Sequence, residues 1–163
     1  MRVYVLATLS FCLPISLQAD EPKNLLKPIN QVESWRLEEH EGAKGTAEAM
    51  EDGIKFIVTE VDGTNWHLQV SQVDLNLVEG KQYTVKFKAM SPESRGYSLV
   101  AMIDQEDWHE IGLHEDLYAS KQLREESFTF TATDVADKKN RIGFVLGDEK
   151  GTLIIKDMTL TEK

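Results

Sequence analysis

Residues 77–89 of the chain read LVEGKQYTVKFKA, and this stretch decides the fold. From Tyr83 to Ala89 apolar and polar residues alternate strictly, so every second side chain falls on the same face of a β-strand. The preceding residues 79–81, Glu-Gly-Lys, are a turn signal. The stretch therefore predicts a turn that leads into a strand with one buried face.

Short runs of the same kind lie on both sides of this strand. They cover residues 54–58, 66–71, 97–103, 128–132, 142–146 and 153–160, with Gly-, Pro- or Asp-containing turns between them. No segment has a convincing long helical period, and residues 36–50 are interpreted as a loop with room for short strands. Short strands separated by turns in this way are typical of an all-β fold, an antiparallel β-sandwich or jelly roll.

The first 19 residues differ from the rest in composition. A short basic start at Arg2 is followed by an almost wholly apolar run over residues 3–17 and by the small residue Ala19. This pattern predicts a secretory signal peptide over residues 1–19 and a single domain over residues 20–163, secreted or periplasmic. The apolar run is too short for a membrane-spanning helix, which needs about 20 residues.

The charge and cysteine content of the chain exclude several classes of function. Twenty-eight acidic residues against 18 basic ones give a net charge of −10, which disfavours nucleic acids and anionic membrane surfaces as partners. The one cysteine, Cys12, lies in the expected signal peptide. A cysteine nucleophile, a zinc–thiolate site and an iron–sulfur cluster are therefore excluded for the mature chain.

Further stretches join the central hairpin in a recognisable order. They read NLLKPINQVESW (residues 24–35), NWHLQVSQ (65–72), RIGFVLG (141–147) and IIKDMTL (154–160). In this order the chain resembles the family 4/9 (CenC-type) carbohydrate-binding modules over residues 24–160. The resemblance implies a galactose-binding-like β-jelly roll. It also implies non-catalytic binding of β-glucans, xylans or related polysaccharides, as in modules that are often attached to glycoside hydrolases.

A sugar site needs aromatic side chains that stack on the flat C–H faces of the rings, beside polar groups that bond the hydroxyls. Two groups of residues meet this description, and they form the candidate ligand-binding set: Trp66, Gln69 and Gln72 on one strand, and Asp104, Trp108 and His109 in one loop. The spacing of Trp66 and Gln69 also matches the ligand-contacting strand of the resembled family. An alternative stays open for Trp66, because period-two spacing would place it in the core with Leu68 and Val70.

The resemblance also implies a structural calcium ion between a glutamate of the N-terminal motif and an aspartate of the last strand. Glu33 and Asp157 stand at those positions. Carboxylate oxygens are the ligands that Ca²⁺ takes in proteins. Two solvated surface carboxylates are the alternative interpretation.

Two other functions remain open beside the binding of a polysaccharide or oligosaccharide. One is an exported structural or adaptor jelly roll that has lost sugar binding, and the other is a small glycoside hydrolase. The stretch from His109 to His114 resembles a zinc-protease motif, but it has one residue too many between the histidines. Residues 38–41, Glu-Glu-His-Glu, are interpreted as part of a solvated loop.

Overall fold

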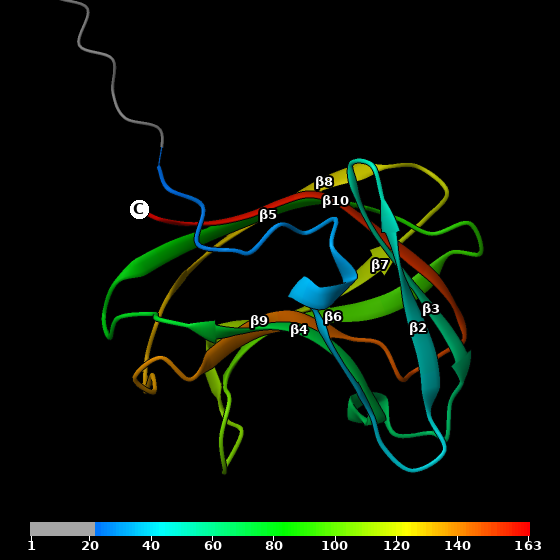
Figure 1. The fold of residues 1–163 in the computed structure, drawn as a ribbon, viewed down its shortest axis with the longest axis horizontal. Helices are drawn as coiled ribbons and strands as arrows, with labels where there is room; N and C mark the ends of the chain where they lie inside the picture. Colours follow the sequence, from blue (N-terminus) through cyan, green and yellow to red (C-terminus); the bar gives the residue numbers. More distant parts are fainter. Residues whose placement is uncertain (1–21) are drawn as a thin grey trace, which may run out of the picture.

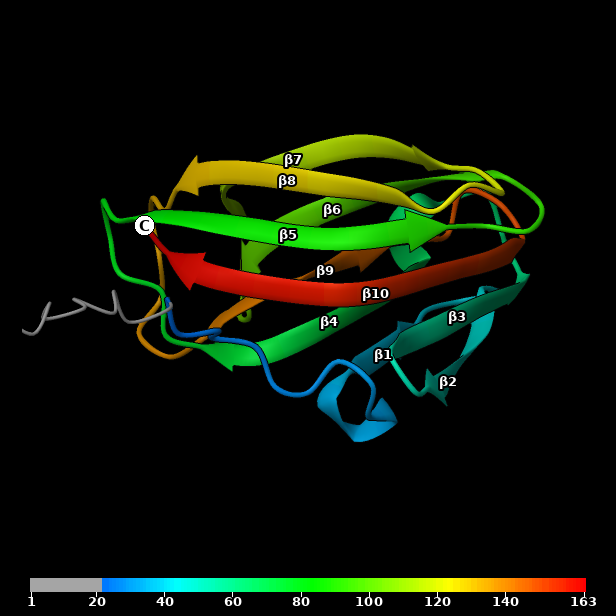
Figure 2. The same cartoon turned by 90° about the horizontal axis from the view of Figure 1, so that it is seen from above.

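The computed structural model describes residues 22–163, which form two antiparallel five-stranded sheets packed face to face (Figure 1). Sheet A holds, in spatial order, β1 (Arg36–Glu39), β4 (Leu68–Leu75), β9 (Asn140–Val145), β6 (Arg95–Ile103) and β7 (Glu110–Ala119). Sheet B holds β2 (Lys44–Met50), β3 (Gly53–Glu60), β10 (Gly151–Glu162), β5 (Gln82–Met90) and β8 (Arg124–Thr131). Two 3-10 turns, η1 (Val32–Ser34) and η2 (Asn65–His67), precede β1 and β4. Figure 2 shows the two sheets stacked, with β9 beside β10, β6 beside β5 and β7 beside β8.

The strand predicted from the central stretch is β5, in the interior of sheet B. Tyr83, Val85, Phe87 and Ala89 are all buried and face the other sheet, as their alternation predicts. β10 pairs with β5 on one side and with β3 on the other, with a bulge after Lys156. The all-β sandwich of jelly-roll type is therefore confirmed.

Aromatic rings fill the space between the sheets. Phe144 of β9 lies at the centre, with ring centroids 5.5 Å from Phe87, 5.9 Å from Tyr97 and 6.2 Å from Trp35. The indole N–H of Trp35 donates to the carbonyl oxygen of Ile29 at 2.9 Å, which anchors the N-terminal segment over the core edge. Burial of such rings is the largest single contribution to a core of this size.

Three segments differ from their predicted structure. Residues 36–50 are two strands, β1 and β2, joined by a tight turn. β7 was not predicted from the sequence, although Ile111 and Leu113 alternate with polar residues and are buried. β4 begins at Leu68, and Trp66 lies in the η2 turn before it.

The predicted signal peptide, with Cys12, lies outside the described residues. Within residues 22–163 no helix has the length and apolar character needed to cross a bilayer.

Candidate functional site

A groove of about 480 Å³ lies on the outer face of sheet A, opposite to the core. The alternation of β6 turns Ser98, Val100 and Met102 outward into this groove. The strand register continues the floor across the sheet, because Val145 of β9 is paired with Ser98 of β6 and with Gln69 of β4. The other lining residues are Glu38, His40, Asn65, Trp66, Trp108, Glu110, His114 and Arg141.

Trp66 forms one rim of the groove. The η2 turn ends the period-two pattern before β4, so the indole does not follow Leu68 into the core but is 52% exposed. Its ring contacts His67 edge-on, with centroids 4.2 Å apart, and lies 5.5 Å from the ring of His40. The sequence left two placements open for Trp66, and in the structure the side chain lies at the groove and not in the core.

Trp108 forms the rim at the other end, in the loop between β6 and β7. Its backbone N–H donates to the carbonyl oxygen of Gln105 at 2.7 Å, and the side chain is 46% exposed. The backbone φ of 62° lies in the left-handed region, which is uncommon for a bulky residue and concentrates at binding sites. This loop and η2 project on the same side of sheet A, away from sheet B (Figure 1).

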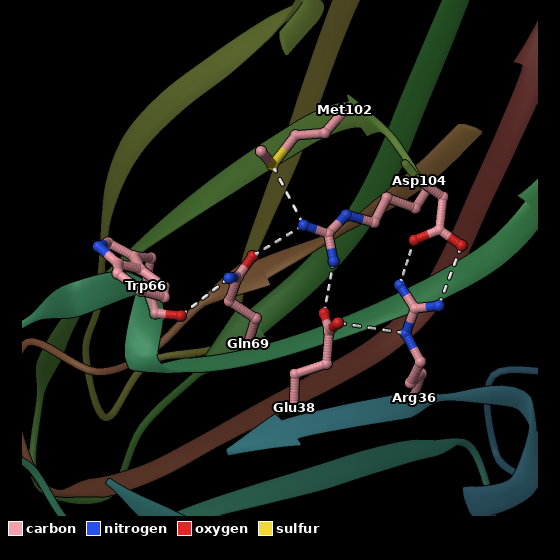
Figure 3. Close-up of polar contacts among 7 residues, drawn as sticks. Arg36, Glu38, Trp66, Gln69, Met102 and Asp104 are labelled. Carbon is pink, nitrogen blue, oxygen red and sulfur yellow. Dashed lines mark hydrogen bonds and ion pairs between the residues drawn. The ribbon is translucent and has the colours of Figure 1, made fainter. Parts of the chain in front are cut away.

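Arg141 is buried in the floor and connects the two rims. Its guanidinium group donates to the carboxylate of Glu38 and to Oε1 of Gln69 at 3.4 Å, and it lies 3.8 Å from the sulfur of Met102 (Figure 3). Gln69 in turn donates from Nε2 to the backbone oxygen of Trp66 at 2.8 Å. Hydrogen bonds therefore run without a break from β9 to the turn that carries Trp66.

A second ion pair supports the first from β1. Arg36 donates to both carboxylate oxygens of Asp104, with an Nη1–Oδ2 distance of 3.0 Å, and its Nε lies 3.5 Å from Glu38 (Figure 3). This pairing lowers the pKa of Asp104 and raises the pKa of Arg36. The negative charges of Glu38 and Asp104 are thus compensated by the positive charges of Arg36 and Arg141 at the floor of the groove.

The side of the groove formed by β7 carries ionisable side chains, His114 and Glu110. Nδ1 of His114 lies 2.5 Å from the carboxylate of Glu110, and its Nε2 lies 3.4 Å from Asp116, which also accepts a hydrogen bond from Ser98 at 2.7 Å. The bond to Glu110 is the main reason that the pKa of His114 is raised. The pKa of Asp116 is lowered, first by the Ser98 hydroxyl and then by His114.

Three of the six predicted ligand-binding residues line the groove, namely Trp66, Gln69 and Trp108. Gln72 does not, because it is fully buried and its amide bonds the backbone N–H and carbonyl of Lys27 at 2.8 and 3.2 Å. Its place on β4, three residues from Gln69, turns it to the opposite face of the sheet.

Asp104 and His109 lie beside the groove but are not among its lining residues. Both carboxylate oxygens of Asp104 accept hydrogen bonds from Arg36. His109 lies 2.8 Å from the backbone oxygen of Asp134 and 2.6 Å from the carboxylate of Asp107, contacts that raise its pKa. His109 therefore holds the loop of Trp108 in place.

The two residues predicted for calcium have separate polar surroundings in the structure. Glu33 is exposed in η1, and exposed Asp157 pairs with Nζ of Lys88 at 2.8 Å. Next along β10, Lys156 pairs with Asp52 at the same distance, so two ammonium groups already neutralise the carboxylates there. Within residues 22–163 no group of three or more His, Cys, Asp or Glu side chains is placed to hold a metal.

Several groove residues were missed at the level of sequence. Glu38 lies in a strand and lines the groove, although its acidic stretch predicted a solvated loop. Arg141 and His114 carry no local signal of a ligand site. The alternation of Ile111 and Leu113 could have shown that His114 points away from the core.

Comparison with known proteins adds an independent line of information. The sequence profile of a family described as carbohydrate binding domain (CBM_4_9) matches residues 28–151. No curated protein sequence matches the chain.

Solved structures share the fold. A CBM4 module is 22% identical with a TM-score of 0.70, over 88% of this chain and 96% of that one. The N-terminal cellulose-binding domain of Cellulomonas fimi β-1,4-glucanase C is 17% identical, with a TM-score of 0.65, over 83% of this chain and 92% of that one. The CBM22-1 xylan-binding domain of Paenibacillus barcinonensis Xyn10C is 9% identical, with a TM-score of 0.56, over 88% and 97%.

Proposed function

The chain belongs to the family 4/9 carbohydrate-binding domains, and from this premise we propose that its groove binds a polysaccharide chain without cleaving it. The ligand class that we propose is a β-linked glucan or xylan. Its support is the family membership together with the cellulose- and xylan-binding neighbours of the same fold.

The observation that carries this proposal is the pair of half-exposed tryptophans at opposite ends of one groove. Between Trp66 and Trp108 the floor is apolar at Val100, Met102 and Val145. Pyranose rings present flat C–H faces that stack on aromatic rings, and stacking releases water from both surfaces. A sugar chain that lies along the groove meets an aromatic ring at each end and apolar side chains between them.

The polar groups of the floor suit an uncharged ligand. Glu38 and Arg141 form an ion pair, and Gln69 joins it, so the site needs no counter-charge from the ligand. The carboxylate and amide oxygens keep lone pairs that can accept hydrogen bonds from sugar hydroxyls. The groups are held in place before the ligand arrives, which reduces the entropy lost on binding.

The two aspartates beside the groove, Asp104 and Asp116, are poorly suited to act as the proton donor of a glycoside hydrolase. A glycoside hydrolase needs a carboxylic acid whose pKa is raised, so that it can protonate the leaving oxygen. The pKa values of Asp104 and Asp116 are lowered by their partners, which keeps both groups ionised.

We also propose that the chain is exported, on the basis of its apolar N-terminal run. Mass spectrometry of the protein from the periplasm or culture medium checks this. The expected N-terminal residue of the mature chain is Asp20.

Affinity gel electrophoresis of residues 20–163 tests the binding proposal. Barley β-glucan, hydroxyethylcellulose and soluble xylan are cast into separate gels, and dextran serves as an α-linked control. Retardation by a β-linked polymer that is lost in the Trp108→Ala variant supports the proposal. A folded protein that no polymer retards contradicts it and favours the exported adaptor.

A further inference from the structure

The outer face of sheet A continues past the groove at the end of β7, where it carries another aromatic side chain. Tyr118 is 63% exposed, more than Trp66 or Trp108, and it does not line the groove. Along β7 it lies on the same face as His114 and Asp116. Tyr118 therefore extends the surface on which His114 lines the groove.

The cross-strand neighbour of Tyr118 has no side chain of its own. This neighbour on β6 is Gly96, and a Cβ atom built there would meet nothing closer than a carboxylate oxygen of Glu149 at 3.5 Å. The N–H of Gly96 donates to that same carboxylate at 2.5 Å. The phenol ring thus stands beside a glycine whose only side-chain neighbour within 4 Å of the Cβ position is the carboxylate of Glu149.

Tyr118 lies at the same end of sheet A as Trp66. In Figure 2 the coil of η2 and the arrowhead of β7 share one end of the sandwich, and the loop of Trp108 precedes the opposite end of β7. At this end β9 and β6 lie between β7 and β4, which follows Trp66. The strand register joins Gln69 through Val145 and Ser98 to Asp116. A chain that crosses the strands along this row from the Trp66 rim therefore reaches Asp116, and Tyr118 lies two residues further along β7.

We propose that Tyr118 and Asp116 form an additional sugar subsite outside the groove, which takes one further unit of the same β-linked chain. This inference rests on the proposed function of the groove. The phenol ring supplies a stacking surface. Both contacts of the Asp116 carboxylate, with Ser98 and His114, use Oδ1, so Oδ2 can accept a hydrogen bond from a sugar hydroxyl.

Titration calorimetry with oligosaccharides of two lengths tests the subsite. The probes are cellotriose and cellohexaose, with xylotriose and xylohexaose as the second series. We expect Tyr118→Ala to weaken hexaose binding by about tenfold, the loss of one stacking contact, and to change triose binding by less than about twofold. Tyr118→Phe keeps the ring and should bind the hexaose like the wild type.

Leu123→Ala is a matched surface control, because Leu123 is a 45% exposed apolar residue outside the groove. It should bind both lengths normally. Equal losses for triose and hexaose in Tyr118→Ala, or no loss for either, would overturn the subsite while leaving the groove proposal intact. A wild-type chain that binds neither series nor any polymer would instead overturn the groove proposal, and the subsite with it.

Discussion

The guanidinium carbon of Arg141 lies 5.3 Å from the ring centre of Trp108, so a buried cation supports an exposed indole. This cation–π contact joins the floor of the groove to its rim. Arg141 is itself held by the carboxylate of Glu38. The position of the stacking surface at Trp108 therefore depends on an ion pair between β9 and β1.

Trp108→Ala should reduce polysaccharide affinity by at least about tenfold while leaving the melting temperature within about 2 °C, because a half-exposed rim residue contributes little to the core. Trp35→Ala is the matched control, since Trp35 is buried and stacks on Phe144. That variant should lose about 3–5 kcal/mol of stability. Normal binding by folded Trp108→Ala would remove Trp108 from the site.

Arg141→Met should destabilise the fold by about 1–3 kcal/mol, because it removes the buried partner of Glu38 and leaves only Arg36, at 3.5 Å, beside that carboxylate. The double variant Glu38→Gln, Arg141→Met should recover part of that loss, since the amide needs no counter-ion. Urea unfolding of the wild type, both single variants and the double variant measures the coupling. Strictly additive losses would show that the two side chains do not act as a pair.

The titration midpoint of His114, followed by NMR, should lie above 6.5, because Glu110 bonds its ring. A folded-state pKa above the unfolded value means that this contribution to stability is fully present below about pH 6.5. It is lost as the pH rises through the folded-state pKa. Glu110→Gln should lower the midpoint, whereas Glu115→Gln, on the other face of β7, should not. An unchanged midpoint in Glu110→Gln would assign the shift to another group.

Asp104→Asn should lower the free energy of unfolding at pH 7 by about 1 kcal/mol, a value reduced by the partial exposure of Arg36. The pKa of Asp104 is lowered from 3.8, so its contribution is present above that value. It is lost as the pH falls through the folded-state pKa. The difference between wild type and variant should therefore shrink below pH 3.8, which unfolding curves across the acid range can check. A constant difference would contradict the ion pair.

The melting temperature should be the same within about 1 °C in calcium and in EDTA. An ion that binds only the folded state would raise the melting temperature, and we expect no such calcium ion here. Lys88 and Lys156 already neutralise Asp157 and Asp52. The double variant Lys88→Gln, Lys156→Gln tests whether these lysines keep calcium away, since it leaves both carboxylates without their ion-pair partners. A calcium-dependent rise in the wild type would restore the ion that the family resemblance implies.

The fold could be predicted because one face of most strands is buried and the other is not. The alternation from Tyr83 to Ala89 is the simplest case. β7 was not predicted, although Ile111 and Leu113 alternate with exposed residues, because Gly112 between them is a residue typical of turns.

The site could be predicted only in part. Trp66 and Gln69 were predicted from their residue types and from the spacing that they share with the resembled family. Gln72 is an odd number of residues from Gln69 and so faces the other way. The pair of Glu38 and Arg141 joins residues 103 positions apart. Such a contact follows from the order of β1, β4 and β9 in the sheet, which no local pattern contains.

The groove is divided between a floor that the fold needs and a rim that it does not. The side chains of Arg141 and Gln69 connect β9, β4 and β1 by hydrogen bonds, so replacing them removes contacts between the strands. Trp66 and Trp108 stand on turns outside those strands. The side chains of the rim can therefore be exchanged without loss of the fold, whereas any change in the floor must also preserve the contacts between the strands.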